Sequence, residues 1–117
     1  MDDLTEMLKG LLEGAVLQVL ARGPNHGYEI VRALNQVGFT SVAEGTVYPI
    51  LMRLTERGQV ETTWETDPPL GRPARHLYRL SGEGARFAKE LRAAAAAEIL
   101  RASRSGGVIR PAPGEAV

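Results

Sequence analysis

The 117-residue chain contains no cysteine, few aromatic residues and no excess of charge of either sign. The absence of cysteine excludes disulfides, thiolate metal ligands and a cysteine nucleophile. No apolar run approaches the ~20 residues that cross a bilayer, and the acidic start MDDLTEM is unlike the basic first region of a signal peptide. With 44% hydrophobic and 24% charged residues, the composition predicts a soluble, cytoplasmic, single-domain globular protein.

The formal net charge is zero, with 14 basic and 14 acidic residues, and this alone argues against a protein that binds polyanions. The charges are nevertheless unevenly divided along the chain. Residues 1–67 hold five basic and ten acidic residues, whereas residues 68–117 hold nine basic and four acidic residues. The position of each half in space therefore decides which surfaces are basic.

Three helices are predicted in the first half, because apolar residues recur there at three- and four-residue steps. A glycine, which readily ends a helix, follows each of them: Gly23, Gly38 and Gly58. The three predicted helices are residues 4–20, 26–37 and 43–57.

After Gly58 the apolar period changes to two, which indicates two strands, residues 59–66 and 75–80. Residues 67–73 contain three prolines and a glycine, so they form a loop and the two strands form a hairpin. The side chains expected on the inner, half-buried face are Val60, Thr62 and Trp64 in the first strand, and Leu80 with either Leu77 or Tyr78 in the second.

A last, long helix is expected from Ser81, a good N-cap residue, to about Ser103. Three helices, a hairpin and a helix make an α+β, mostly α fold, a winged helix-turn-helix with a long C-terminal helix. We expect residues 1–80 to form the DNA-binding domain and residues 81–104 a dimerisation helix in the same compact unit. The Gly- and Pro-rich residues 105–117 are expected to be a disordered tail.

The long helix carries an apolar stripe that this winged-helix core does not need, so we expect a second copy of the chain to cover it. The first and last helices of each protomer would then form a homodimer. The residues expected in the interface are Leu8, Leu11, Leu12, Phe87, Leu91, Ala95 and Ile99.

Three motifs resemble those of the PadR family of bacterial transcriptional regulators, in its short form with one C-terminal helix. Residues 23–30 are similar to the family pattern GPxHGYEI, residues 45–58 to GTLYPxLxRLExxG, and residues 72–84 to RPxRxYYxLTxxG. The resemblance covers about residues 8–90. Departures include Val60-Glu61 after Gly58, His76-Leu77 in the third motif, and Met52, where the family often has a basic residue or histidine. The resemblance implies a winged-helix regulator of transcription.

The third helix is expected to be the recognition helix, whose N-terminal residues face base edges in the major groove. Inside a helix Pro49 would cost about 3 kcal/mol, so the helix should begin near Gly45 or bend there. Tyr48 is either a half-buried core residue or a phosphate contact, and the resemblance favours the contact. Arginines of the wing, the hairpin loop, are placed to reach phosphate or the minor groove. The predicted DNA-binding residues are Tyr28, Gly45, Thr46, Tyr48, Pro49, Arg53, Arg72 and Arg75.

Two other function classes are compatible with parts of the sequence. The acidic first half of the chain favours a ligand-sensing or protein-interaction module without DNA binding. Glu44 at the start of the recognition helix would either accept a hydrogen bond from cytosine N4 or repel phosphate, and the sequence leaves both open. An enzyme or metal-binding domain lacks a motif, because His26 and His76 have no ligand cluster around them. We therefore expect a non-enzymatic regulator without cofactor, most simply a repressor of an inverted-repeat operator. The resemblance also allows a small aromatic or other apolar effector.

Overall fold

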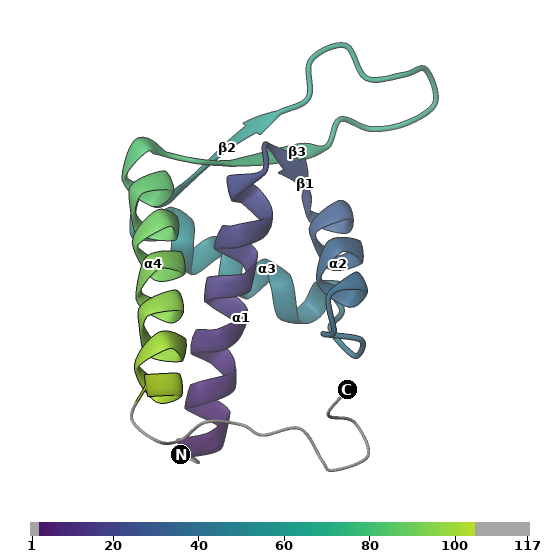
Figure 1. Cartoon of the computed structure of the whole chain (residues 1–117). Coiled ribbons are helices and arrows are strands. Elements are labelled where there is room, and N and C mark those ends of the chain that lie inside the picture. Colours follow the sequence, from purple (N-terminus) through teal and green to yellow (C-terminus); the bar gives the residue numbers. More distant parts are fainter. Residues whose placement is uncertain (1–2, 105–117) are drawn as a thin grey trace, which may run out of the picture.

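The computed structural model describes residues 3–104, which form four helices and one small antiparallel sheet (Figure 1). The α+β, mostly helical architecture is the predicted one. The predicted disordered tail, residues 105–117, lies outside the described residues. In chain order the elements are α1 (Asp3–Ala21), β1 (Asn25–His26), α2 (Gly27–Gln36), α3 (Glu44–Glu56), β2 (Val60–Trp64), β3 (His76–Leu80) and α4 (Gly82–Arg104).

The core lies where α1, α2 and α3 meet the base of the hairpin, and α4 runs alongside α1 (Figure 1). The apolar residues that predicted the helices supply this core, because each helix turns its three- and four-residue stripe inward. The buried apolar residues are Val16, Leu17, Leu20, Ile30, Leu34, Val47, Ile50, Leu51, Leu54, Val60, Tyr78 and Ala88.

The sheet has the order β1-β3-β2, so β3 is its central strand. β2 pairs antiparallel with β3, with Thr62 opposite Tyr78 and Trp64 opposite His76. The short β1 pairs with the other edge of β3, with Asn25 opposite Tyr78. The sequence prediction missed β1, because two residues are too few to show a period.

The prediction that β2 is half-buried is wrong beyond its first residue. Val60 is buried, but Thr62 and Trp64 are exposed, because the hairpin extends past the helices and no layer covers its far end (Figure 1). Trp64 instead packs across the hairpin, with its ring centroid 3.8 Å from that of His76. In β3 the buried side chain is Tyr78 and not Leu77.

Two features fix the start of α4: the predicted N-cap residue, Ser81, and the close approach of Gly84 to the backbone of Gln59. The Gly84 N–H donates to Ser81 Oγ over 3.0 Å, which confirms Ser81 as the N-cap. A Cβ at Gly84 would lie 1.9 Å from the backbone oxygen of Gln59, so only glycine allows α4 to approach the turn between α3 and β2 so closely.

Candidate nucleic-acid interface

α3 begins at Glu44, close to Gly45 as predicted, and Pro49 lies in its second turn. One face of α3 is buried through Val47, Ile50, Leu51 and Leu54. The predicted contact residues Gly45, Thr46 and Pro49 all lie on its exposed surface. The N-terminal half of α3 is thus available to a partner.

Tyr48 lies at the edge of this exposed surface and has a partner in α2. Its ring is 40% exposed, and a Cβ at Gly27 would be only 2.6 Å from its hydroxyl oxygen. The two readings of Tyr48 are therefore compatible, because one side of the ring packs on the Gly27 backbone while the other meets solvent. Gly27 has a structural role that the sequence reading did not assign.

A hollow of about 300 Å³ joins three predicted contact residues from three elements. Tyr28 comes from α2, Tyr48 from α3, and Arg75 from the end of the wing, which spans residues 65–75 here. The residues that line the hollow are His26, Gly27, Tyr28, Tyr48, Arg75, His76 and Tyr78. Burial raises the pKa of Tyr78 above its usual 10, with a smaller contribution from Tyr48, so Tyr78 remains a neutral phenol.

The N-terminus of α2 opens at this hollow. His26 is the N-cap residue of α2, but its side chain makes no capping hydrogen bond, and its Nδ1 instead lies 2.9 Å from the His76 carbonyl oxygen. The first N–H groups of a helix have no partner within the helix and carry a partial positive charge. Together with the Arg75 guanidinium and the tyrosine hydroxyls, they make the hollow suited to an anion such as a phosphate.

The two wing arginines are in different situations. Arg72 donates from Nη2 to both Glu65 oxygens, at 2.8 and 2.9 Å. This hydrogen bond, against a smaller effect of desolvation, lowers the pKa of Glu65. Arg75 has no ion pair among the described residues and is exposed. Arg72 therefore holds the wing together, while Arg75 is available for an external anion.

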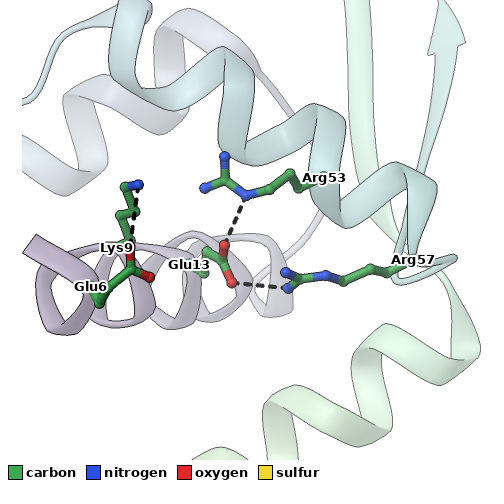
Figure 2. A network of polar contacts seen from close by, with 5 residues as sticks. All are labelled: Glu6, Lys9, Glu13, Arg53 and Arg57. Atoms are coloured by element: carbon green, nitrogen blue, oxygen red, sulfur yellow. Dashed lines mark hydrogen bonds and ion pairs between the residues drawn. The ribbon is translucent and has the colours of Figure 1, made fainter. Parts of the chain in front are cut away.

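Arg53, also predicted to contact DNA, is held by α1 in the structure. Its Nε lies 3.0 Å from Glu13 Oε2, and Arg57 Nη1 lies 3.0 Å from Glu13 Oε1, so both carboxylate oxygens of Glu13 are occupied (Figure 2). Burial raises the pKa of Glu13, but the hydrogen bonds and charges of Arg57 and Arg53 outweigh it and leave that pKa lowered. This three-residue network, which we call the Glu13 cluster, joins α1 to the end of α3.

The predicted dimerisation residues divide into packed and exposed ones. Leu12 and Leu91 are half-buried against the core, whereas Leu8, Leu11, Phe87, Ala95 and Ile99 are exposed. Leu11, Leu91 and Ala95 line an apolar groove of about 410 Å³ between α1 and α4, together with Phe39, which the sequence reading did not assign. α1 and α4 approach closely there, because Gly14 faces Leu91 Cδ1.

In the described part of the chain, histidine, aspartate and glutamate side chains do not gather in groups of three or more that could hold a metal ion. Between residues 3 and 104, the helices are too short or too polar to cross a membrane.

Sequence and structure comparisons agree on one family. The model of the family described as "Transcriptional regulator PadR-like family" matches residues 16–90. No curated protein matches the chain significantly.

Solved structures give the same result. A PadR-like transcription factor from Bacteroides fragilis is 29% identical, with a TM-score of 0.76, over 87% of this chain and 97% of the other. A PadR-like transcriptional regulator from Bacillus cereus is 30% identical, with a TM-score of 0.69, over 86% and 98%. Bacillus subtilis PadR in complex with operator DNA, 23% identical, shares the fold with a TM-score of 0.59, over 68% and 45%. The chain therefore belongs to the PadR-like family of transcriptional regulators, which agrees with the prediction of a non-enzymatic regulator.

Proposed function

We propose that this protein is a cytoplasmic, homodimeric DNA-binding repressor, in which each α3 reads one half of an inverted-repeat operator. The observation that carries the DNA-binding part is the hollow, because it brings Tyr28, Tyr48 and Arg75 from α2, α3 and the wing to one place. A repressor of this geometry blocks transcription by occupying its operator. The structural neighbour from Bacillus subtilis, which was solved with operator DNA, supports the choice of partner.

A backbone phosphate beside the major groove fits the hollow. The tyrosine hydroxyls donate neutral hydrogen bonds, Arg75 supplies a charge-assisted one, and the N-terminus of α2 adds its N–H groups. Such contacts fix the position of the protein on the duplex but carry no sequence information. The exposed N-terminal half of α3, with Gly45, Thr46 and Pro49, is then left to face the bases.

Zero net charge does not oppose this function, because the charges are distributed locally. Several arginines are paired with carboxylates within the fold: Arg72 with Glu65, and Arg53 and Arg57 together with the single carboxylate of Glu13. Arg75, without an ion pair among the described residues, adds a net positive charge at the hollow itself. Phosphate contact depends on this local charge and not on the total.

The DNA-binding proposal is tested by removing one charge at the hollow. We expect Arg75→Ala to weaken binding of the promoter fragment from the protein's own locus about tenfold and to reduce the salt dependence by about one counterion. Arg86→Ala, which removes an exposed charge from α4, is the matched control and should leave both unchanged. Fluorescence anisotropy over a range of salt concentrations measures both quantities.

Two results would contradict the proposal. Equal affinities of Arg75→Ala and Arg86→Ala for DNA would show that the hollow is not part of the DNA interface. Salt-independent binding, or the absence of DNA binding together with capture of a protein, would instead favour a protein-interaction module.

The dimer part of the proposal is supported by the apolar groove between α1 and α4 and by the exposed Leu8, Leu11 and Ile99 beside it. Light scattering should report about 25 kDa, twice the 12.6 kDa of the chain. Ala95→Glu would place a charge in the groove and should give monomers. Ala93→Glu, on the same helix but not among the groove residues, should remain dimeric, and a monomeric wild type would reject the dimer.

The same groove supports the effector part of the proposal, because a small molecule that enters it would compete with the partner protomer for the same apolar surface. A volume of about 410 Å³ lies in the range of small-molecule pockets, and Phe39 and Leu91 offer apolar contacts to a flat ring. A phenolic acid that binds there should release the protein from DNA in the anisotropy assay. The proposal requires Phe39→Ala to bind DNA normally and to lose this response, so release that persists in the variant would exclude the groove.

A further inference from the structure

The outermost stripe of α3, opposite its buried face, consists of Gly45, Pro49 and Met52 in its first three turns. These residues follow one another at steps of four and three, so they lie on one line along the helix. All three are exposed, Met52 by 63%, whereas Val47, Ile50, Leu51 and Leu54 face the core. A helix that enters the major groove presents this line to the base edges.

The stripe offers no cation to the bases. The only basic residues between positions 44 and 57 are Arg53 and Arg57, and both donate to Glu13 at 3.0 Å. Arginine or lysine bound to O6 and N7 is the commonest way for a protein to recognise guanine. The Glu13 cluster holds Nε of Arg53 and Nη1 of Arg57 against α1, so neither guanidinium belongs to the stripe.

The side chains that the stripe does offer are apolar. Met52 has a flexible thioether that adapts to an irregular apolar surface, and Pro49 presents a rigid ring. Gly45 has no atom within 4 Å of the position of a Cβ, so nothing projects there to keep the helix from the floor of the groove. In the major groove, the apolar group that a base presents is the 5-methyl of thymine.

We propose that Pro49 and Met52 read thymine methyl groups in the operator, so that this regulator recognises its half-site through apolar contacts from α3. The inference rests on the proposed DNA-binding function and adds the specificity-determining residues. The hollow supplies affinity through phosphate, and the stripe supplies the preference for thymine at the positions that it covers.

The experiment removes methyl groups from the DNA without changing its base pairing. Binding sites are first selected from a random duplex library with the full chain. Each thymine of the selected half-site is then replaced by deoxyuridine, which lacks the 5-methyl. Burying one such group contributes enough to change affinity about fourfold, so at least one replacement should weaken binding by that factor.

Variants of Met52 connect the methyl group to the side chain. Met52→Ala should reduce the deoxyuridine effect at one position to nearly none, whereas Met52→Leu, which keeps an apolar side chain, should retain it. Because Met52 is exposed, both variants should unfold at the wild-type temperature, and this is measured alongside. Replacing guanines by 7-deazaguanine, which removes N7, should leave the affinity unchanged at the positions that α3 covers.

The outcomes separate this inference from the function on which it rests. Binding that is indifferent to deoxyuridine, or that falls with 7-deazaguanine instead, overturns the apolar readout while DNA binding stands. A deoxyuridine effect of equal size in wild type and Met52→Ala overturns the assignment to Met52. Failure to select any DNA sequence overturns the proposed function, and this inference with it.

Discussion

The Glu13 cluster and the hollow at the N-terminus of α2 use the same side chain, arginine, in opposite ways. In the cluster, one carboxylate with a side chain only 18% exposed holds two guanidinium groups, so both arginines have an ionic partner within the fold (Figure 2). In the hollow, Arg75 is exposed beside tyrosines and uncapped helix N–H groups, and no carboxylate lines the cavity. The sequence motifs do not show this difference, because it depends on which arginines the fold provides with an internal partner.

Among variants of these two regions, Gly27→Ala in the hollow should have the largest effect on affinity for DNA. A Cβ there would lie 2.6 Å from the Tyr48 hydroxyl, so the ring must move out of its place at the hollow. Since the ring is partly exposed it can do so, and the free energy of unfolding should change by only about 1 kcal/mol. Affinity for DNA should nevertheless fall about tenfold, because a hydrogen bond to phosphate is lost.

Gly82→Ala is the matched control for that variant, because Gly82 also begins a helix and has nothing within 4 Å of its Cβ position. Anisotropy and urea unfolding measure the two variants in parallel. If Gly27→Ala bound DNA as well as Gly82→Ala, Tyr48 would be a packing residue only.

A smaller effect, on stability alone, is expected for Glu13→Gln. The variant leaves Arg53 and Arg57 without their anion, but both are substantially exposed, so the loss should be about 1–2 kcal/mol at pH 7. The affinity of the folded protein for DNA should not fall, because the change removes no cation from the molecule. Reduced affinity for DNA at unchanged stability would show that the Glu13 cluster is part of the DNA interface.

The pH dependence of stability provides a second measurement on the same pair of proteins. Because the folded state lowers the pKa of Glu13 below its ordinary 4.5, this carboxylate stabilises the fold above that pH. Its contribution is lost as the pH falls from 4.5 through the lowered value. Urea unfolding should therefore show the wild type and Glu13→Gln converging in stability under acidic conditions, and a constant difference between them would contradict the assignment.

The smallest effect is expected for Glu65→Gln in the wing. This change weakens the hold on Arg72 and removes a negative charge near Arg75, so affinity for DNA at low salt should rise by about twofold. The unfolding temperature should fall only slightly, because the pair is half-buried and confined to the wing. Glu61→Gln, which breaks the exposed pair with Arg79, is the control, and an equal rise in both would indicate a general charge effect.

Most of the fold was predictable from local pattern. The helices follow from apolar residues three and four apart, and the N-cap role of Ser81 from its residue type. The prediction of burial in the hairpin was wrong. Trp64 lies on the predicted face of β2, but no layer of the described residues covers that face. Alternation in a strand shows which side chains share a face, and only the surrounding layers decide whether that face is covered.

The arrangement of the candidate site was predictable in part. The sequence singled out Tyr28, Tyr48 and Arg75, and the structure brings them together around one hollow. The sequence did not show that Arg53 forms an ion pair within the fold. It also did not show that the Tyr48 ring packs on Gly27. The only signal in the sequence for a role of Gly27 is its place before Tyr28 in the first motif. That signal does not identify Tyr48 as the ring that packs on Gly27.

The sequence by itself determined the order of the four helices and the hairpin, the family and the candidate contact residues. Only the tertiary structure decided which charges remain for a partner. Glu13 and Arg53 are 40 positions apart, and their ion pair exists because α1 and α3 pack together. Pairing at such distances depends on the packing of elements and not on local spacing, so a neutral chain can fold to leave one arginine unpaired where an anion fits.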